Sequence, residues 1–224
     1  MQTLNRLVRA AAHEIKNPLA IILQGVEHLK QSIRSDDKTI YLTLNYIEDA
    51  AKRIDSVISG VVDFFSLSEL DIKSADFTSI IENALLSLKE QFDKNHIQII
   101  KNFKGDIPLV KVDKNRIEHV LVGLFLNAIQ AMPSGGNLTI KTSTQLEPTE
   151  EVWVIAQIED SGCGMSEDVL KNIFTPFFTT KLNLQALGLG LSIARNIIQM
   201  HGGKIEIENR TDNPGVRVTV MLKI

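Results

Sequence analysis

Two long runs of apolar residues, spaced three or four positions apart, constrain this chain more than any other feature. The first covers residues 4–33 and the second residues 40–65, with a polar break at 35–38 between them. Such spacing predicts two amphipathic helices, each with one narrow apolar seam. The short break favours an antiparallel hairpin. Because a hairpin buries one stripe per helix, we expect two hairpins to form a dimeric four-helix bundle; the alternative is a hairpin docked on the chain's own second domain.

One histidine lies off the first seam. His13 is two residues before Ile15, about 200° round the helix, so its side chain is expected to face solvent. Glu14 adjoins it, and Asn17 follows four residues later on the same exposed face. Taken alone, His13 is most simply interpreted as an ordinary surface histidine. A zinc-protease helix would need a second histidine where Asn17 stands, which disfavours that interpretation.

Composition narrows the class of protein. Hydrophobic residues make up 44% of the chain, enough for a packed core, and the net charge of -3 gives no reason to expect nucleic acid or anionic membrane as a partner. The single cysteine, Cys163, excludes an internal disulfide and fits a reducing compartment. No apolar run approaches the roughly 20 residues of a membrane span. We expect a cytoplasmic chain without membrane contact of its own, or the cytoplasmic part of a longer, membrane-anchored protein.

The polar, irregular stretch at residues 66–75 marks the expected boundary between a first domain, 1–68, and a second, 69–224. Patterning in the second domain predicts helices grouped against a mostly antiparallel sheet, an α+β sandwich. The expected helices are 76–92, 114–132 and 189–201, and the expected strands are 97–103, 109–112, 137–144, 152–159, 204–209 and 217–222.

Two stretches of this second domain offer polar groups in an apolar or glycine-rich setting. Asn127 is the one amide in an otherwise apolar helical run, and its oxygen suits Mg²⁺, although a buried, hydrogen-bonded asparagine is the commoner case. Asp160 stands at a strand end, where its carboxylate can accept a hydrogen bond from an exocyclic amine such as that of adenine. Gly162 and Gly164 allow the following backbone to turn tightly against a flat ring, although such a segment alone is usually a turn.

Two further stretches could handle phosphate. Residues 174–181 are rich in phenylalanine and end at Lys181, whose point charge suits a phosphate group, although a plain hydrophobic clasp is the simpler interpretation. Gly188 and Gly190 stand where the last long helix is expected to begin, and free N–H groups at a helix start bind phosphate. The loop-like segment between Phe178 and Gly188 suits a mobile lid over a nucleotide.

All four stretches in this order, behind a helical hairpin that carries a histidine, resemble a sensor histidine kinase of a two-component system. The resemblance extends over essentially the whole chain. His13-Glu14-x-x-Asn17-Pro18 is similar to the family's H box, and the segment from Asn127 to its N box. The segments from Asp160, Phe174 and Gly188 are similar to the first glycine box, the F box and the second glycine box. The phenylalanine-rich form is most similar to the nitrogen-regulation branch.

The resemblance implies an activity and a set of roles. ATP with Mg²⁺ would bind the second domain, with Asn127 on the metal, Asp160, Gly162 and Gly164 at the adenine, and Lys181, Gly188 and Gly190 at the phosphates. His13 would take the γ-phosphoryl group, with Glu14 as base or orienting group, and pass it to an aspartate of a response regulator receiver domain. Asn17 could hold a water for dephosphorylating that regulator. The expected assembly is a homodimer.

Two other functions remain open at this level. Hydrolytic ATPases of the same superfamily, such as gyrase and the heat-shock chaperones, carry a water-activating glutamate four residues before the metal-binding asparagine. Position 123 is glycine here, which disfavours hydrolysis. A non-catalytic dimeric scaffold that binds nucleotide is the third hypothesis, because Ala186 and Leu187 stand where the family commonly has a glycine and a threonine just before the second glycine box.

Overall fold

The structure is a computed structural model of the 224-residue chain. It describes residues 2–32, 38–65, 70–146, 151–180 and 188–224; within these ranges, the side chains of 2–11, 13, 14, 32, 38, 53, 56, 57 and 59–65 are not described. The chain divides into two compact units. The smaller is built on residues 1–68, and the larger comprises residues 69–180 and 190–224.

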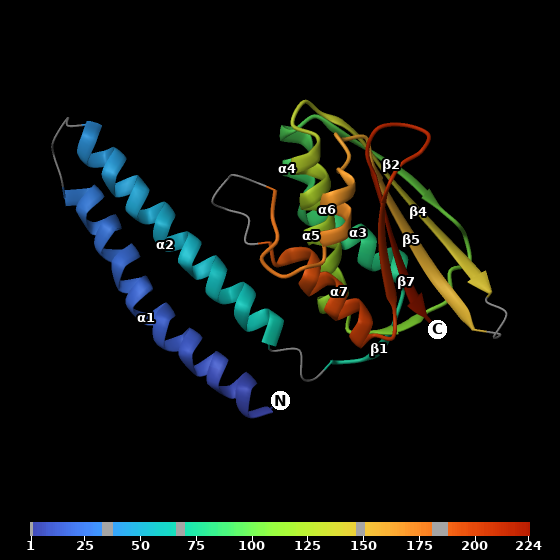
Figure 1. The fold of residues 1–224 in the computed structure, drawn as a ribbon, viewed down its shortest axis with the longest axis horizontal. Coiled ribbons are helices and arrows are strands. Elements are labelled where there is room, and N and C mark those ends of the chain that lie inside the picture. The colour runs from blue at the N-terminus through green and yellow to red at the C-terminus, as the bar shows by residue number, and fades with distance from the viewer. Residues whose placement is uncertain (1, 33–37, 66–69, 147–150, 181–187) are drawn as a thin grey trace. The chain divides into compact units, whose positions relative to one another are not determined.

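The smaller unit is a helical hairpin. Helix α1 (Gln2–Ser32) continues without interruption through Pro18, and α2 (Lys38–Phe65) runs back beside it (Figure 1). Lys30 pairs with Glu48, and the Lys16 Nζ lies 3.7 Å from an oxygen of Asp55. Residue numbers therefore rise along one helix as they fall along the other, which confirms the predicted antiparallel hairpin.

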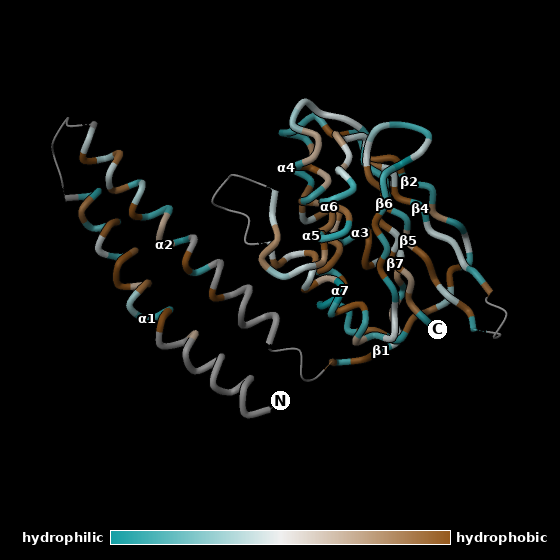
Figure 2. Tube along the Cα trace, in the orientation of Figure 1, coloured by the Kyte–Doolittle hydropathy of each residue, from teal (hydrophilic) through white to brown (hydrophobic). Residues whose placement is uncertain are grey.

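Each helix of the hairpin carries two apolar rows, and only one row per helix is buried. Where Figure 2 colours the two helices, apolar and polar residues alternate along them. The buried rows are 3–8% exposed and repeat every seven residues, as the rows of a coiled coil do. They consist of Ala12, Leu19 and Val26 on α1 and Leu44, Ala51 and Ile58 on α2.

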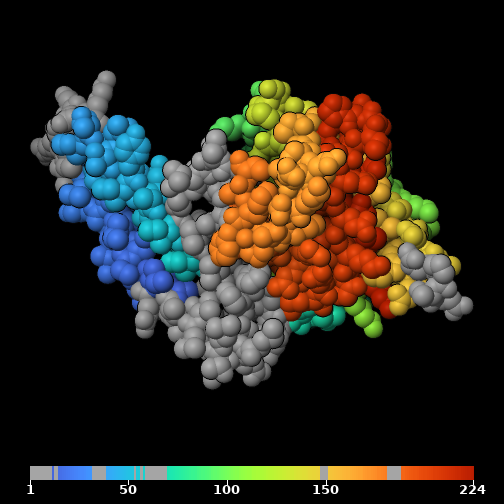
Figure 3. All heavy atoms as spheres, in the orientation of Figure 1, coloured from blue at the N-terminus to red at the C-terminus, as the bar shows by residue number. Residues whose placement is uncertain are grey.

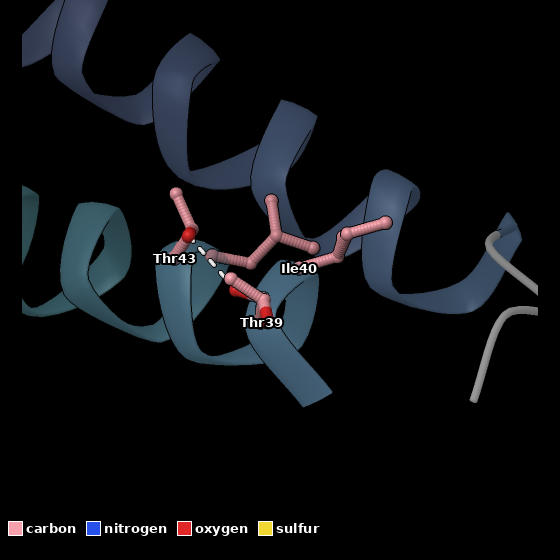
Figure 4. A pocket seen from close by; sticks show the side chains of 4 residues that line it. Thr39, Ile40 and Thr43 are labelled. Carbon is pink, nitrogen blue, oxygen red and sulfur yellow. Dashed lines mark hydrogen bonds between the residues drawn. The ribbon is translucent and has the colours of Figure 1, made fainter. Parts of the chain in front are cut away.

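The second pair of rows has the same seven-residue spacing but is 36–48% exposed. We call it the exposed heptad rows; it consists of Ile15, Ile22 and Leu29 on α1 and Ile40, Ile47 and Ile54 on α2. Figure 4 shows where it begins on α2: Ile40 lies beside Thr43, whose hydroxyl donates to the Thr39 carbonyl at 2.8 Å. Thr39, Ile40, Thr43 and Leu44 line a shallow hollow of about 220 Å³ there.

The larger unit is built on a five-stranded sheet with the order β2-β4-β5-β7-β6. The pair β2·β4 is parallel, and the other three pairs are antiparallel, so the predicted mostly antiparallel sheet is confirmed. A second, two-stranded antiparallel sheet joins β1 (Lys73–Ala75) to β3 (Val110–Val112). The strands of the large sheet are β2 (Ile97–Phe103), β4 (Gly136–Leu146), β5 (Val152–Asp160), β6 (Lys204–Asn209) and β7 (Val216–Lys223).

Helices cover one face of this sheet (Figure 1). They are α3 (Phe77–Ser87), α4 (Lys89–Lys94), α5 (Lys114–Ala131), α6 (Glu167–Asn172) and α7 (Gly190–Met200). The core lies between the helices and the sheet, where Phe92 and Phe125 meet edge to face with ring centroids 6.4 Å apart. The α+β architecture predicted from the sequence is therefore confirmed.

Besides shifts of one or two residues at several element ends, the structure differs from the sequence-based expectation in three places. One is α6, which no expected helix covered. The helix expected over 76–92 is broken at Leu88, whose N–H reaches back to the Leu85 carbonyl, and α4 continues beyond it. Leu88 and Phe92 are both buried, as two positions four apart on one unbroken helix face would also be, so their burial does not account for the break. The segment expected to be irregular, 66–75, contains β1, whose pairing with β3 no local pattern indicates.

Candidate functional site

Asp160 is the last residue of β5, and strand alternation places it on the helix-covered face of the sheet. Ile158 and Ala156, two and four residues earlier, are buried on the same face. The Oδ1 of Asp160 accepts hydrogen bonds from the backbone N–H groups of Gly162, at 2.8 Å, and Val216, at 3.2 Å. Among the residues that the structure describes, no hydrogen bond reaches Oδ2, so that oxygen can accept from a ligand.

The Asp160 carboxyl is buried, and its pKa is shifted as a result. The residue is only 6% exposed, and burial raises the pKa of its carboxyl above the ordinary value. The two backbone hydrogen bonds and the positive charge of Arg210 act in the opposite direction. A carboxyl with a raised pKa in a partly enclosed position is typical of ligand-binding sites, because the local structure pays a free-energy cost to keep it there.

The backbone after Asp160 passes close to its neighbours, and two glycines make that possible. A Cβ on Gly162 would lie 2.6 Å from the Ala131 carbonyl oxygen at the end of α5. Gly164 has a φ of +72°, a left-handed conformation that residues with a Cβ adopt only with strain. The loop at residues 162–165 can therefore follow this path only with glycine at both positions.

Asn127 and Gly190 line the same cavity, which lies between α5 and α7 within the larger unit. The cavity has a volume of about 50 Å³ and is lined by His119, Val120, Gly123, Leu124, Asn127, Gly190, Leu191, Ile193 and Ala194. This volume accommodates a few water-sized groups, so the cavity admits one end of a ligand rather than a whole nucleotide. A Cβ built on Gly123 or Gly190 would meet no atom within 4 Å, so both glycines border open space.

The start of α7 has the features of a phosphate site. The helix begins at Gly190, one residue later than the sequence indicated, and Gly188 precedes it with a φ of +65°. The first N–H groups of a helix have no partner within the helix and carry its positive dipole end. An anion at the mouth of the cavity would therefore meet backbone donors from α7 and the amide side chain of Asn127.

The phenylalanine-rich stretch is described only as far as Thr180, so the predicted phosphate contact of Lys181 lies outside the described residues. Phe174 lies under the guanidinium of Arg195 on α7, with the Cζ atom 5.0 Å from the ring centroid. Phe177 is exposed and has a φ of +67°, which a bulky side chain adopts only at a cost of about 1–3 kcal/mol.

The three residues predicted to act at the phosphoryl acceptor belong to α1, in the smaller unit. The backbone of His13 and Glu14 is helical, while the positions of their side chains lie outside the described residues. Asn17 is exposed one turn further along. The roles predicted for these three residues, like those of the nucleotide-site residues, stay predictions.

Sequence reasoning missed three residues that support the candidate site. Asn209, at the end of β6, binds the backbone of Met165 through both atoms of its amide. Arg210 donates from Nη1 to the Asp160 carbonyl at 3.3 Å while pairing with Asp212. The only local signal, the Asp212-Asn213-Pro214-Gly215 run, indicates a turn and does not reveal contacts 44 to 50 residues back along the chain.

The third missed residue is His201, which joins the two helices that line the cavity. Its Nε2 accepts from the backbone N–H of Asp113, the N-cap of α5, at 2.9 Å. Because Nε2 is an acceptor, the neutral ring carries its proton on Nδ1, which lies 2.7 Å from the Ile197 carbonyl oxygen of α7. The ring thus ties the start of α5 to the end of α7.

The residue before Asp160, Glu159, is a buried carboxylate whose charge is neutralised by side chains of the two neighbouring strands. The Glu159 carboxylate lies on the opposite face and pairs with Lys141 at 2.9 Å and with Arg217 at 2.7 Å. Burial acts to raise the pKa of this carboxyl, but the hydrogen bonds from Lys141 and Arg217 outweigh it and hold the pKa below its ordinary value. Glu159 is therefore a sheet-bracing anion rather than a candidate acid or base.

No helix formed by the described residues combines the length and the apolar character needed to cross a bilayer.

Two family models match the chain. The model described as "Histidine kinase-, DNA gyrase B-, and HSP90-like ATPase" matches residues 112–224, and the "His Kinase A (phospho-acceptor) domain" matches residues 3–70. The second match includes His13, and the first includes Asn127, Asp160 and both glycine segments. Neither match tests the predicted similarity to the nitrogen-regulation branch.

Curated relatives align with nearly the whole chain. Sensor histidine kinase ZraS of Escherichia coli O157:H7 is 29% identical over 221 residues, which are 99% of this chain and 46% of that protein. Sporulation kinase E of Bacillus subtilis is 29% identical over 209 residues, 93% of this chain and 27% of that protein. The chain therefore spans less than half of the length of these relatives.

Two solved structures share the fold. Histidine kinase ThkA, in a complex with response regulator protein TrrA, has a TM-score of 0.67 and 28% identity, covering 99% of this chain and 62% of that chain. Full-length ShkA, solved with AMPPNP, has a TM-score of 0.79 and covers 97% of this chain and 45% of that one. At 18% identity the second likeness concerns the fold alone.

Proposed function

Because this chain belongs to the sensor histidine kinases of two-component systems, we propose that it transfers the γ-phosphoryl group of ATP to His13 and then to an aspartate of a response regulator. The observation that carries the proposal is the combination of two features in one chain. A phospho-acceptor domain includes His13, and a separate unit has a cavity lined by Asn127 and Gly190 beside the start of a helix.

Adenine recognition is assigned to Asp160. With Oδ1 occupied by two backbone donors, Oδ2 accepts from the exocyclic amine of adenine, and the loop at residues 162–165 contacts the ring. The phosphates extend toward the start of α7, where backbone N–H groups, together with Lys181, neutralise their charge. The amide oxygen of Asn127 suits Mg²⁺, which would supply further charge neutralisation at the phosphates.

His13 attacks through its neutral ring nitrogen. A bond forms between that nitrogen and the γ-phosphorus as the bond from phosphorus to the ADP oxygen breaks, and Glu14 accepts the proton from the other ring nitrogen. The phosphoramidate then gives its phosphoryl group to a carboxylate of the receiver domain. Transfer of this kind depends on alignment and charge neutralisation more than on covalent chemistry by the protein.

A homodimer is the assembly that the hairpin favours. The exposed heptad rows repeat with the spacing of a coiled-coil seam, and a second copy of the hairpin would cover them in a four-helix bundle. Hydrolysis of ATP is disfavoured as the main activity. Gly123, one helical turn before Asn127, borders the cavity with no side chain to activate a water.

One assay separates the proposed kinase from its alternatives. The chain is incubated with γ-labelled ATP and Mg²⁺, and acid-labile, base-stable phosphate is measured on the protein. A kinase labels itself, a hydrolytic ATPase releases free phosphate, and a nucleotide-binding scaffold does neither. His13→Ala should abolish labelling, and Asn127→Ala should lose labelling together with nucleotide binding. Unlabelled wild-type chain, or label that persists in His13→Ala, would refute the proposed function.

The same helix supplies a matched control. His28 is an exposed histidine of α1, fifteen positions after His13, so His28→Ala should label like the wild type. Asn17→Ala tests the reverse reaction: labelling should persist, whereas dephosphorylation of a labelled receiver domain should slow. Full phosphatase activity in Asn17→Ala would remove that residue from the mechanism and leave the kinase proposal intact.

A further inference from the structure

Asn209 makes a two-point contact with the loop that follows Asp160. Its Oδ1 accepts from the backbone N–H of Met165 at 2.8 Å, and its Nδ2 donates to the Met165 carbonyl at 2.6 Å. One side-chain amide thus satisfies both backbone groups of a residue 44 positions earlier. In the space-filling view, the orange residues that follow β5 lie against the red residues of β6 and β7 (Figure 3).

The contact holds the far end of the loop, whereas Asp160 holds the near end. At the near end, the N–H of Gly162 donates to Asp160 Oδ1, and Gly162 packs on the carbonyl of Ala131. At the far end, a Cβ on Gly164 would lie 3.2 Å from Asn209 Oδ1, so loop and amide are in close contact. Residues 162–165 are therefore fixed at both ends, and only one end is fixed by the residue assigned to adenine.

Residues that follow Asn209, in the turn after β6 and at the start of β7, also contact Asp160 itself. Arg210 donates to the Asp160 carbonyl, and the N–H of Val216 donates to its carboxylate. A Cβ on Gly215 would lie 2.0 Å from the Asp160 carbonyl oxygen, so the turn between β6 and β7 touches the strand end directly. This turn is thus a second support for the loop, separate from the helices that line the cavity.

From this geometry we propose that Asn209 is a positioning residue, which holds the loop at residues 162–165 at the spacing from Asp160 that admits adenine. The proposal rests on the proposed function, because it concerns the same nucleotide site. Without the amide, the N–H and carbonyl of Met165 lose their partners, and the loop relaxes toward water to satisfy them. Asp160 keeps its own hydrogen bonds, so its carboxylate stays in place while the far end of the loop, at Met165, moves.

The test compares Asn209→Ala with Asn209→Ser in the full chain. The alanine removes both hydrogen bonds, and the serine hydroxyl can restore one. We expect Asn209→Ala to bind Mg²⁺·ATP about tenfold more weakly and to lose most of its preference for ATP over GTP. Asn209→Ser should lie between alanine and wild type in both measurements. Amide exchange of the peptide over residues 160–166, measured without nucleotide, should accelerate in the same order.

The preference for ATP over GTP separates positioning from mere stability, because a general loss of stability would not change that ratio. Asn95→Ala is the matched control: its Nδ2 also donates to a backbone carbonyl, that of Gln91 at 2.7 Å, at the end of α4. This variant should keep wild-type affinity and selectivity. If Asn209→Ala melts earlier but retains selectivity and loop exchange, the positioning role is wrong. If the wild type binds no ATP, the proposed function itself is wrong.

Discussion

The two units of this chain bury their apolar residues in opposite ways. In the hairpin, the buried rows form one narrow seam, and an equally regular set of rows stays 36–48% exposed. In the larger unit, helices close over one face of the sheet, and Phe77, Phe92 and Phe125 are at most 1% exposed. The larger unit therefore has a complete core of its own, whereas the hairpin has half of one.

Because of this difference, the two units that take part in the proposed reaction are stabilised in different ways. The nucleotide site requires atoms fixed to a fraction of an ångström, and it stands on the unit whose core is closed. The proposed phosphoryl acceptor, His13, has to be accessible, and it lies on α1, whose exposed heptad row is not covered within the hairpin. The stability of the hairpin should consequently depend on protein concentration, and that of the larger unit should not.

The largest expected effect comes from removing a large side chain from the core of the larger unit. Phe125→Ala removes a fully buried ring that meets Phe92 edge to face, and the free energy of unfolding of the larger unit should fall by about 3–5 kcal/mol. Urea unfolding followed through Trp153, the only tryptophan, reports on this unit alone. The association state of the hairpin, measured by sedimentation, should not change.

A matched truncation on the surface sets the baseline for that measurement. Leu86 on α3 is 70% exposed, so Leu86→Ala should change the free energy of unfolding by no more than about 0.5 kcal/mol. If Phe125→Ala also dissociated the chain into monomers, the two units would not be independently stable, and the comparison above would fail.

The second-largest expected effect concerns the exposed heptad rows of the hairpin. Ile47→Glu places a charge in the exposed heptad rows, where a partner hairpin would bury it, so dimer dissociation should become at least about a hundredfold easier. Sedimentation at several concentrations measures this, and the Trp153 transition should stay in place. Asn45→Glu, an equally charged change at an exposed position two residues earlier, should remain dimeric. A stable Ile47→Glu dimer would show that the exposed heptad rows do not form the interface.

The same contrast explains what could be predicted from the sequence. Periodic patterns predicted both long helices and, at 97–103 and 204–209, strands with the same limits as β2 and β6. Those patterns are local, because burial of a helix stripe or strand face repeats every few residues. They could not show which apolar row of each helix is buried within the hairpin, since a spacing of three and four residues marks both rows alike.

Features set by distant contacts were missed for a common physical reason. β1 begins with Lys73 and Ser74, which have no strand pattern, and it exists because it pairs with β3. The break at Leu88 involves neither glycine nor proline, so no local residue indicated it. At the candidate site, motifs predicted which side chains offer chemistry, but the supports from Asn209, Arg210 and His201 join residues 44 to 88 positions apart.

The smallest expected effect tests a local support within the larger unit. Asp113 caps α5, accepting from the backbone N–H of Arg116 through Oδ1 and from that of Asp71 through Oδ2, both at 3.1 Å. Asp113→Ala should lower the free energy of unfolding by about 1 kcal/mol at pH 7, measured by urea titration through Trp153. Asp113→Asn keeps one oxygen to accept from Arg116, whereas its NH2 group cannot accept from Asp71, so its stability should lie between those of the wild type and Asp113→Ala.

The pH dependence of that loss identifies its cause. Burial acts to raise the pKa of the Asp113 carboxyl, but its backbone hydrogen bonds outweigh this and hold the pKa below the ordinary value. A folded-state pKa below the unfolded one means that the carboxylate stabilises the fold above the unfolded pKa, and that this stabilisation disappears as pH falls through the folded pKa. The difference between wild type and Asp113→Ala should therefore shrink between pH 7 and pH 3. A difference that stayed constant would show that the charge of the carboxylate does not carry the effect and that Asp113 acts by packing.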